Sequence, residues 1–372
     1  MNILYYLVDF DNLMTKWQHV HIFDELERHG HYVHIYDPQK YRSIEDANEN
    51  IVSFISNCKT KFDLFMNCMS SEYLFPGTII NVNNLGLPTL LICFDNLHAP
   101  FMHKNIAHLF DIVWLTSFET KLMFEKWGCK KILFQPYAAN PYTFTPRWCD
   151  PIHSVCFIGS PYGSRVNKLN LLTKSKIDCD VYSDTLITPK SSQKQDAEKS
   201  SNIKFSDFIN QIACALSFKI GHKLIYSAFK NKYLFKNNSE LDMNDFLNAY
   251  SSVTFEDMQV IYSNSLLSLN ITELRNTYIL KNPIHKIHLR TFEIPMCGGL
   301  EIASYTDELA GYFEDGKEIV LYKTDEEFIS KTKFYLDPSN STQVFKMKKK
   351  ARLRAENDHT WMKRFQNIFD NL

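Results

Sequence analysis

Short, uninterrupted apolar runs separated by amphipathic stretches constrain the fold of this chain more than any other feature of its sequence. Within residues 2–117 the runs are NILYYLVDF, FDLFMNC, TLLICFDN and FDIVWLTS, and helical patterns such as WQHVHIFDELERHG lie between them. A strand that is apolar along its whole length must be buried on both faces, as in parallel sheets covered by helices. The pattern therefore predicts an α/β fold.

The same alternation restarts after TPRWCDP, residues 145–151, which carries two prolines and has no periodicity. We predict two Rossmann-like domains, residues 1–147 and 152–357, whose parallel sheets face each other across a cleft. Residues 186–250 are interpreted as a helical insertion in the second domain. The C-terminal helix, about 358–372, can pack back on the first domain.

Charge and composition exclude several classes of protein. The formal net charge of −1 gives no global attraction to nucleic acid, so no nucleic-acid partner is expected. The nine cysteines are scattered without a CxxC, which is typical of reduced thiols in the cytoplasm. The sequence DCD at 178–180 falls in a predicted strand, so we predict no metal site.

Nothing at the start of the sequence resembles a targeting segment, since MNILYYLVDF lacks a basic stretch and a cleavage site. No apolar run approaches the ~18 residues of a spanning helix. A cytoplasmic location is expected. The basic run KMKKKARLR is interpreted as a solvated helix face, with peripheral contact at the inner face of the membrane as the alternative.

The loop FIGSPYGSRVNKL, residues 157–169, joins a strand to a helix. Gly159 ends the strand, and Arg165 and Lys168 open the helix, so amides and cations are available for a diphosphate. The alternative is an ordinary βα turn with a solvated basic helix start. The Walker pattern and G-x-G-x-x-G are both absent, which argues against a nicotinamide oxidoreductase.

A second candidate stretch, RTFEIPMCGG, runs from Arg290 to Gly299. It predicts a short helix that ends at Gly298. Glu293 in its first turns can accept hydrogen bonds from a ribose diol, and Arg290 can meet a phosphate. The alternative is a glutamate that caps its own helix.

The C-terminal third resembles the group 1 glycosyltransferases of GT-B fold, in particular the CgeB-like branch. The resemblance is carried by RTFEIPMCGG, YFEDGKEIVLYKTDEEF and HTWMKRFQNIF, and more loosely by GLPTLLICFDN and FDIVWLTSFETKLMFEKWG in the N-terminal half. It implies transfer of a sugar from a nucleotide-sugar, with a UDP-sugar favoured, to a hydroxyl of a glycan, glycolipid or protein. It also implies a retaining, metal-independent and cofactor-free reaction in surface polysaccharide, lipopolysaccharide or other glycoconjugate synthesis.

The resemblance also assigns residues in the second domain. Related enzymes space two glutamates as E-x7-E, and Glu293 and Glu301 fit that spacing literally. The family's second glutamate precedes the glycine stop, as Glu293 does, so Glu293 resembles the ribose-binding residue. The first position then falls on His285, where a glutamate is usual. His285 is therefore a candidate catalytic residue, and a non-catalytic sugar-nucleotide-binding protein is the alternative function.

The first domain supplies candidates for the acceptor side. CFDNLHAPF places Asp95 and His98 at the carboxyl end of an apolar strand, where the resemblance implies that they face the donor. Such residues can orient the acceptor hydroxyl or assist proton transfer. VDFDNLMTKW adds Asp9 and Asp11 to the acceptor side. The alternative in each case is a polar turn.

Overall fold

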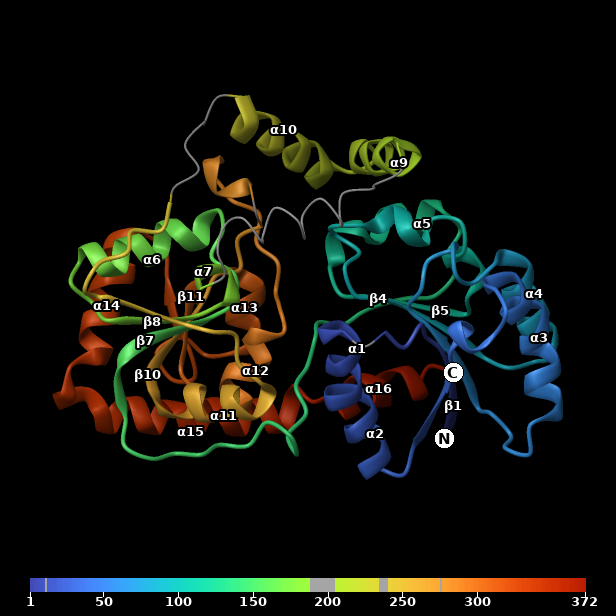
Figure 1. Ribbon diagram of the computed structural model, residues 1–372, viewed down its shortest axis with the longest axis horizontal. Coiled ribbons are helices and arrows are strands. Elements are labelled where there is room, and N and C mark those ends of the chain that lie inside the picture. The colour runs from blue at the N-terminus through green and yellow to red at the C-terminus, as the bar shows by residue number, and fades with distance from the viewer. Residues whose placement is uncertain (11, 188–204, 234–239, 275) are drawn as a thin grey trace. The chain divides into compact units, whose positions relative to one another are not determined.

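The computed structural model describes residues 1–10, 12–187, 205–233, 240–274 and 276–372. The chain divides into two compact units. Unit 1 consists of Met1–Asn140, Ile209–Gly221 and Trp361–Leu372, and unit 2 of Pro141–Phe208 and His222–Thr360. Each unit contains a six-stranded parallel sheet with helices packed on it (Figure 1). The predicted α/β class with two parallel sheets is confirmed.

The sheet of unit 1 has the strand order β2-β1-β3-β4-β5-β6. Its strands are β1 (Asn2–Tyr6), β2 (Tyr32–Tyr36), β3 (Leu64–Asn67), β4 (Thr89–Cys93), β5 (Ile112–Leu115) and β6 (Ile132–Phe134). Its helices are α1 (Leu13–Gln18), η1 (His19–Phe23), α2 (Asp24–Arg28), α3 (Ile44–Asn57), α4 (Pro76–Asn84), α5 (Lys121–Lys126) and α16 (Trp361–Phe369), with short 3-10 turns at Pro38–Lys40, Pro100–His103, Ala107–Leu109 and Phe118–Thr120.

Both faces of this sheet are apolar, which explains the continuous runs in the sequence. On one face, side chains of β1, β3, β4 and β5 form a core cluster with α3, α4 and α5. On the other face, α16 buries Trp361, Phe365 and Ile368, which recur at helical spacing. The Trp361 ring lies 6.0 Å from the ring of Trp114 on β5. Strands buried on both sides must run through the middle of the unit.

The sheet of unit 2 has the strand order β12-β11-β10-β7-β8-β9. Its strands are β7 (Ile152–Ile158), β8 (Cys179–Tyr182), β9 (Leu247–Tyr250), β10 (Ser265–Asn270), β11 (Glu301–Ser304) and β12 (Val320–Tyr322). Its helices are α6 (Ser164–Lys174), α7 (Asp184–Ile187), α11 (Phe255–Asn264), α12 (Arg290–Met296), α13 (Asp307–Tyr312), α14 (Asp325–Leu336) and α15 (Ser341–Asp358), with 3-10 turns at Thr277–Ile279 and Pro338–Asn340.

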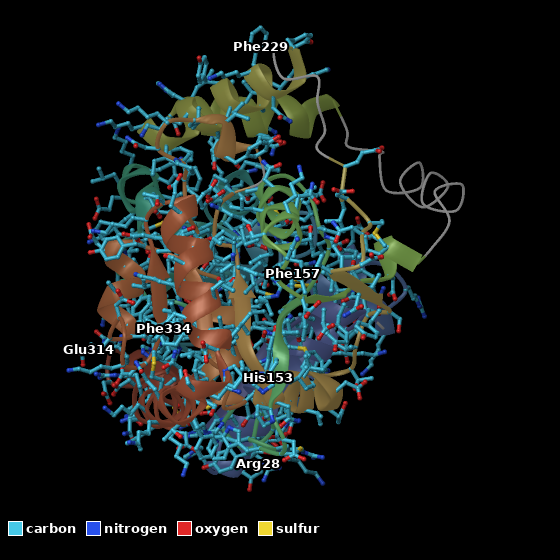
Figure 2. The ribbon with its side chains drawn as sticks, turned by 90° about the vertical axis from the view of Figure 1, so that its left-hand side faces the viewer. Arg28, His153, Phe157, Phe229, Glu314 and Phe334 are labelled. Atoms are coloured by element: carbon cyan, nitrogen blue, oxygen red, sulfur yellow. The ribbon has the colours of Figure 1, made fainter. Side chains whose placement is uncertain are left out.

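In unit 2, α6 and α14 lie on one side of the sheet, and α11, α12 and α15 lie on the other (Figure 1). β7 begins at the surface, where His153 is exposed, and runs into the interior, where Phe157 is buried (Figure 2). The sheet therefore has a distinct amino edge near His153. Its carboxyl edge lies just beyond Phe157.

Two further helices, α9 (Phe205–Leu216) and α10 (Lys219–Tyr233), fall in the segment for which mostly helical structure was expected. Between them, Phe218 packs against the core of unit 1 and the Ser217 hydroxyl lies 3.1 Å from the sulfur of Met123. The same segment ends in β9, a strand at the edge of the unit 2 sheet, which the helical expectation did not include.

The basic run KMKKKARLR and the predicted C-terminal helix follow each other with no helix-breaking residue between them, but the structure separates them at His359–Thr360 into α15 and α16. The carboxylate of Glu25 accepts hydrogen bonds from the amides of Trp361 (3.1 Å) and Met362 (2.8 Å). These bonds satisfy the first amides of α16, so a new helix begins there. Glu25 lies far away in sequence, and no local pattern announces the break.

All nine cysteines are free thiols, and Cys149 is exposed. No helix in the described part of the chain combines the length and the apolarity that crossing a bilayer requires.

Candidate functional site

The strand order of the unit 2 sheet reverses between β7 and β10. β7 is its first strand in the sequence, and the later strands are added on one side from β8 and on the other from β10. Loops that leave such a pair of strands diverge, and α/β sheets bind ligands at this point, beyond the carboxyl ends of the strands. Gly159 directly follows β7, and Asn270 is the last residue of β10. This edge of unit 2 is therefore the candidate site.

Gly159 and Arg290 lie against each other at this edge. Gly159 has a φ of +138°, and a Cβ atom at this position would lie 2.4 Å from Nη2 of Arg290. The backbone conformation favours glycine here, and a larger residue would also displace the guanidinium of Arg290. Arg290 is the first residue of α12 and is half-buried. The two residues predicted from separate sequence motifs meet in the structure.

Glu293 lies one turn further along α12 and is 4% exposed. Its charge affects the pKa of Tyr262, a buried residue of α11. Burial raises the pKa of Tyr262 well above its usual value, Arg290 lowers this pKa, and Glu293 raises it. The Tyr262 hydroxyl has no hydrogen-bond partner among the described residues. The charges of Arg290 and Glu293 on α12 therefore act on the buried Tyr262.

A buried network lies beneath α12. Nδ2 of Asn270 donates to Oγ1 of Thr291 (2.9 Å) and to Oε1 of Glu301 (2.8 Å). Glu301 is 2% exposed, and burial raises its pKa to about 8, although the bond from Asn270 lowers it. The Glu301 carboxyl is thus protonated at neutral pH. The network connects the end of β10 and the start of β11 to the first turn of α12, which carries Arg290 and Glu293.

The two cations of α6 are engaged by neighbouring groups. Nη1 of Arg165 donates to the carbonyl of Ser160 (3.0 Å), and its guanidinium lies 4.4 Å from the ring centroid of Tyr162. Arg165 therefore braces the loop that follows β7. Nζ of Lys168 lies 2.5 Å from Oδ1 of Asp325 on α14. This ion pair joins α6 to α14.

His285 lies in the chain that follows β10, paired in an antiparallel bridge with Glu273. Nδ1 of its ring forms a hydrogen bond of 2.9 Å with the hydroxyl of Thr272. Burial lowers the pKa of His285, Glu273 raises it, and Lys168 lowers it. The imidazole is therefore neutral at pH 7, and it lies near Lys168 at the same edge of the sheet.

In unit 1, Asp95 and His98 form an exposed turn after β4. The carbonyl of Asp95 accepts hydrogen bonds from the amides of His98 and Ala99, each at 2.9 Å. Beside them, Asn96 is buried, and its side chain donates to the carbonyl of Ser117 (2.6 Å) and accepts from the Thr116 amide (3.0 Å). Asn96 fixes the loop, and the fixed loop presents Asp95 and His98 at the surface.

Of the two acceptor-side candidates in the first loop, Asp9 and Asp11, only Asp9 lies within the described residues. Asp9 follows β1, and its Oδ1 lies 3.2 Å from Nε2 of His19. Asp11 lies outside the described residues. Across the described ranges, no group of three or more His, Cys, Asp or Glu side chains is arranged to hold a metal ion.

Comparison with solved structures identifies the architecture. HepE of Anabaena, solved in complex with UDP and glucose, matches 100% of this chain and 98% of its own, with 9% identity and a TM-score of 0.57. An alpha-glucosyltransferase, solved with UDP and a 13-mer DNA containing a HMU base, matches 100% and 98%, with 13% identity and a TM-score of 0.60. The fold is GT-B. Sucrose-phosphate synthase of Thermosynechococcus elongatus also matches over 100% of both chains, with 12% identity and a TM-score of 0.53.

Sequence comparison adds one finding to the GT-B architecture. Residues 244–370 match the family model described as glycosyl transferase-like. The matched segment runs from β9 to α16 and contains His285, Arg290, Glu293 and Glu301. No curated protein sequence matches the chain.

The predicted site residues fall into three sets by their location and their partners. The structure places Gly159, Arg290 and Glu293 together at the carboxyl edge of unit 2, with His285 beyond β10. Arg165 and Lys168 are near this edge but are held by Ser160, Tyr162 and Asp325. Asp9, Asp95 and His98 belong to unit 1.

Sequence reasoning missed two residues of this edge, Asn270 and Thr291, and also Tyr262 of α11, whose pKa Arg290 and Glu293 affect. The E-x7-E spacing is a signal for Glu301, which the alignment to the glycine stop set aside. Asn270 and Thr291 carry no local signal, because they meet only when β10 and α12 are brought together.

Proposed function

We propose that this GT-B protein is a glycosyltransferase that takes its sugar from a nucleotide-sugar donor bound at the carboxyl edge of unit 2. The observation that carries the proposal is the placement of the Arg290 guanidinium against Gly159, where the strand order reverses. A cation at that point meets the diphosphate of a nucleotide, and the glycine lets backbone and ligand approach closely. UDP is the favoured nucleotide, by analogy with HepE and the alpha-glucosyltransferase, whose structures contain UDP.

Glu293 is assigned to the ribose of the donor. A carboxylate can accept two hydrogen bonds from a vicinal diol, and Glu293 lies one turn from Arg290 on the same helix.

In the proposed reaction, the bond between the anomeric carbon and the diphosphate oxygen breaks, and the acceptor oxygen becomes bonded to that carbon. Negative charge grows on the leaving nucleoside diphosphate, and Arg290 stabilises it. The acceptor hydroxyl loses its proton, for which Asp95 or His98 of unit 1 is the proposed base. The neutral imidazole of His285 is proposed to hydrogen-bond a hydroxyl of the donor sugar.

The finer aspects of the proposal follow the family resemblance. They are retention of the anomeric configuration, a metal-independent reaction, and an acceptor hydroxyl on a glycan, glycolipid or protein. Synthesis of surface polysaccharide or another glycoconjugate at the cytoplasmic face of the membrane is the proposed setting. The DNA in the alpha-glucosyltransferase complex makes the acceptor the part of the proposal that most needs a direct screen.

One observation favours a second candidate function, a sugar-nucleotide-binding protein without turnover. His285 stands where related enzymes carry a glutamate, and a neutral imidazole bonded to Thr272 cannot supply a carboxylate's charge. Release of UDP from a UDP-sugar, measured with and without acceptors, separates the two functions. Binding without release across the donor panel would favour the second.

The donor site is tested by calorimetric titration of UDP into wild type, Arg290→Ala and the matched control Arg147→Ala. Arg147 is an exposed arginine of the same unit, before β7. We expect Arg290→Ala to weaken UDP binding by about 10–150-fold, since a hydrogen bond to a charged group contributes about 1.5–3 kcal/mol. The control should bind as wild type. Equal affinities in all three proteins would refute the site. If no UDP binds, thermal-shift screening with GDP-, dTDP- and CMP-sugars tests the other nucleotides.

A further inference from the structure

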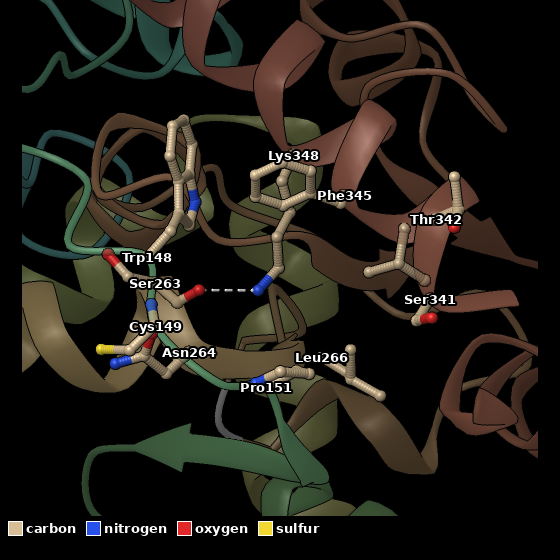
Figure 3. Close-up of a pocket in the computed structure, with 11 residues that line it drawn as sticks. Trp148, Cys149, Pro151, Ser263, Asn264, Leu266, Ser341, Thr342, Phe345 and Lys348 are labelled. Carbon is tan, nitrogen blue, oxygen red and sulfur yellow. Dashed lines mark hydrogen bonds between the residues drawn. The ribbon is translucent and has the colours of Figure 1, made fainter.

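Unit 2 contains a cavity at the opposite edge of its sheet from the candidate donor site. The cavity has a volume of about 290 Å³. It opens beside the amino ends of β7 and β10, where Pro151, Asn264 and Leu266 line it (Figure 3). Its other walls come from the chain before β7 and from α15. Seven residues of β7 separate the two edges, roughly 23 Å at 3.3 Å per residue.

A buried lysine forms part of the wall of this cavity. Lys348 of α15 is 3% exposed, and its Nζ donates to the carbonyls of Ser263 (2.8 Å) and Ser265 (2.6 Å). An ammonium group carries three hydrogens, so one donor remains after these two bonds. Within the described ranges, no carboxylate forms an ion pair with Lys348. Buried charges in proteins are normally paired, so this ammonium lacks its counter-ion.

The charge of Lys348 persists at neutral pH. Burial lowers the pKa of Lys348 to about 8, while the Cys156 thiol raises it. At pH 7 most of the side chain is therefore still an ammonium. The first residues of the 18-residue helix α15, Ser341 and Thr342, also line the cavity. The positive end of the helix dipole thus reinforces the attraction for an anion.

The apolar wall of the cavity is held in place by the end of α12. The rings of Trp148 and Phe345 meet edge to face at 5.3 Å. Nε1 of Trp148 donates to the carbonyl of Gly298 (3.0 Å), and a Cβ atom on Gly298 would lie 2.7 Å from Nε1. The indole therefore has a fixed position, against which a flat or aliphatic group can pack.

We propose that this cavity is a second binding site, for a small organic carboxylate whose anionic end meets Lys348 and whose apolar body packs on Trp148 and Phe345. The buried ammonium of Lys348 matches one carboxylate, and a second ammonium, that of Lys349, lies over the rings of Phe345 (4.6 Å to the centroid) and Trp148 (6.0 Å). The volume lies at the lower end of the ~300–1,000 Å³ found for ligand pockets, so the ligand is small. The site is independent of the proposed glycosyltransferase function, since it uses none of the residues assigned to the donor.

The exposed thiol of Cys149 provides a reporter, because it lines the same cavity. The probe is 3-phenylpropanoate, and its amide is the uncharged control. Alkylation of Cys149 by iodoacetamide is followed by peptide mass spectrometry in the full-length protein. At about ten times its dissociation constant, the carboxylate should slow alkylation about tenfold, and the amide should have little effect.

Lys348→Met should abolish the protection, and Lys350→Met, which changes an exposed lysine of the same helix, should keep it. If Lys348→Met does not fold, Trp148→Ala replaces it, and the protection should fall because half of the apolar wall is removed. Equal protection by acid and amide, no protection at 10 mM probe, or undiminished protection in Lys348→Met or Trp148→Ala would overturn the proposal.

Discussion

Unit 2 buries Glu293, its proposed donor-binding carboxylate, whereas unit 1 exposes Asp95, its proposed base. Glu293 is 4% exposed and Glu301, the first residue of β11, is 2% exposed, but Asp95 lies on an exposed turn after β4. The two sheets also differ in order, since unit 2 places two strands beyond one side of its first strand and unit 1 places only β2 there. The same α/β plan therefore buries the carboxyl group of one candidate site and exposes that of the other.

The difference has a physical meaning for binding. A buried acid is stable only if its partners are fixed before a ligand arrives, as Asn270 is for Glu301. A preformed polar edge of this kind suits the part of a substrate that is the same in every reaction, such as the nucleotide of the donor. An exposed turn on a fixed scaffold tolerates variation, which suits a changing acceptor. Four predictions test this contrast.

Glu293→Ala has the largest expected effect. We expect turnover to fall by about 10³-fold, because a preorganised polar group is removed from the buried edge. Glu293→Gln keeps the shape and one acceptor oxygen, and should retain more activity. The measurement is kcat/KM for UDP-sugar turnover, with circular dichroism to verify folding. Unchanged turnover in a folded Glu293→Ala protein would remove this residue from the site.

Glu301→Gln tests burial through stability. The folded pKa of Glu301 is about 8, against about 4.3 for an unfolded glutamate. Between these values the folded state holds a proton that the unfolded state has released, so wild-type stability falls as pH rises through this window. The slope is at most about 1.4 kcal/mol per pH unit. The glutamine variant lacks this proton, and its urea midpoints should fall less between pH 5 and pH 8.

Glu49, an exposed residue of α3, serves as the control for this measurement. Glu49→Gln should leave the pH dependence of stability parallel to that of wild type, because this side chain faces solvent. Parallel curves for wild type and Glu301→Gln would contradict the burial of a neutral Glu301.

Asp95→Asn should separate chemistry from donor binding. Removal of a general base lowers turnover by about 10²-fold, while UDP affinity should remain that of wild type. Steady-state kinetics and calorimetry on the same preparation measure the two effects. A loss of UDP affinity would instead place Asp95 on the donor.

Arg165→Ala has the smallest expected effect. The sequence predicts Arg165 as a donor contact, but the structure engages it with Ser160 and Tyr162. Loss of this brace should weaken UDP binding only about 3–10-fold, the equivalent of one ordinary hydrogen bond. A loss as large as that of Arg290→Ala would show that Arg165 reaches the ligand itself.

Much of the fold could be read from local patterns. The runs around β1, β3, β4 and β5 predicted buried parallel strands, and the structure confirms them. β9 was missed because LNAY is short and half-exposed at a sheet edge, so it lacks an apolar run. The break before α16 was missed because Glu25, which caps that helix, is 336 residues away.

The candidate site divides in the same way. Gly159, Arg290 and Glu293 carry local signals, namely a glycine after a strand and charges in a short helix. The partner of Lys168 could not be predicted, because Asp325 lies 157 residues further on. Lys348, within a basic run interpreted as a solvated face, is buried because carbonyls at the start of β10 accept its hydrogen bonds. Such partners are far apart in the sequence and meet only in the folded chain, so a short stretch of sequence cannot predict them.

Unit 1 is built from three separate segments of the chain, and this has a consequence for its synthesis. Its sheet is complete by residue 140, but the helix that covers Trp114 begins only at Trp361. At 5–20 residues per second, the intervening chain takes roughly 10–45 s to translate. During that interval an aromatic surface of a nearly finished domain stands open to water. We therefore expect the nascent chain of this protein to bind chaperones that shield apolar surfaces.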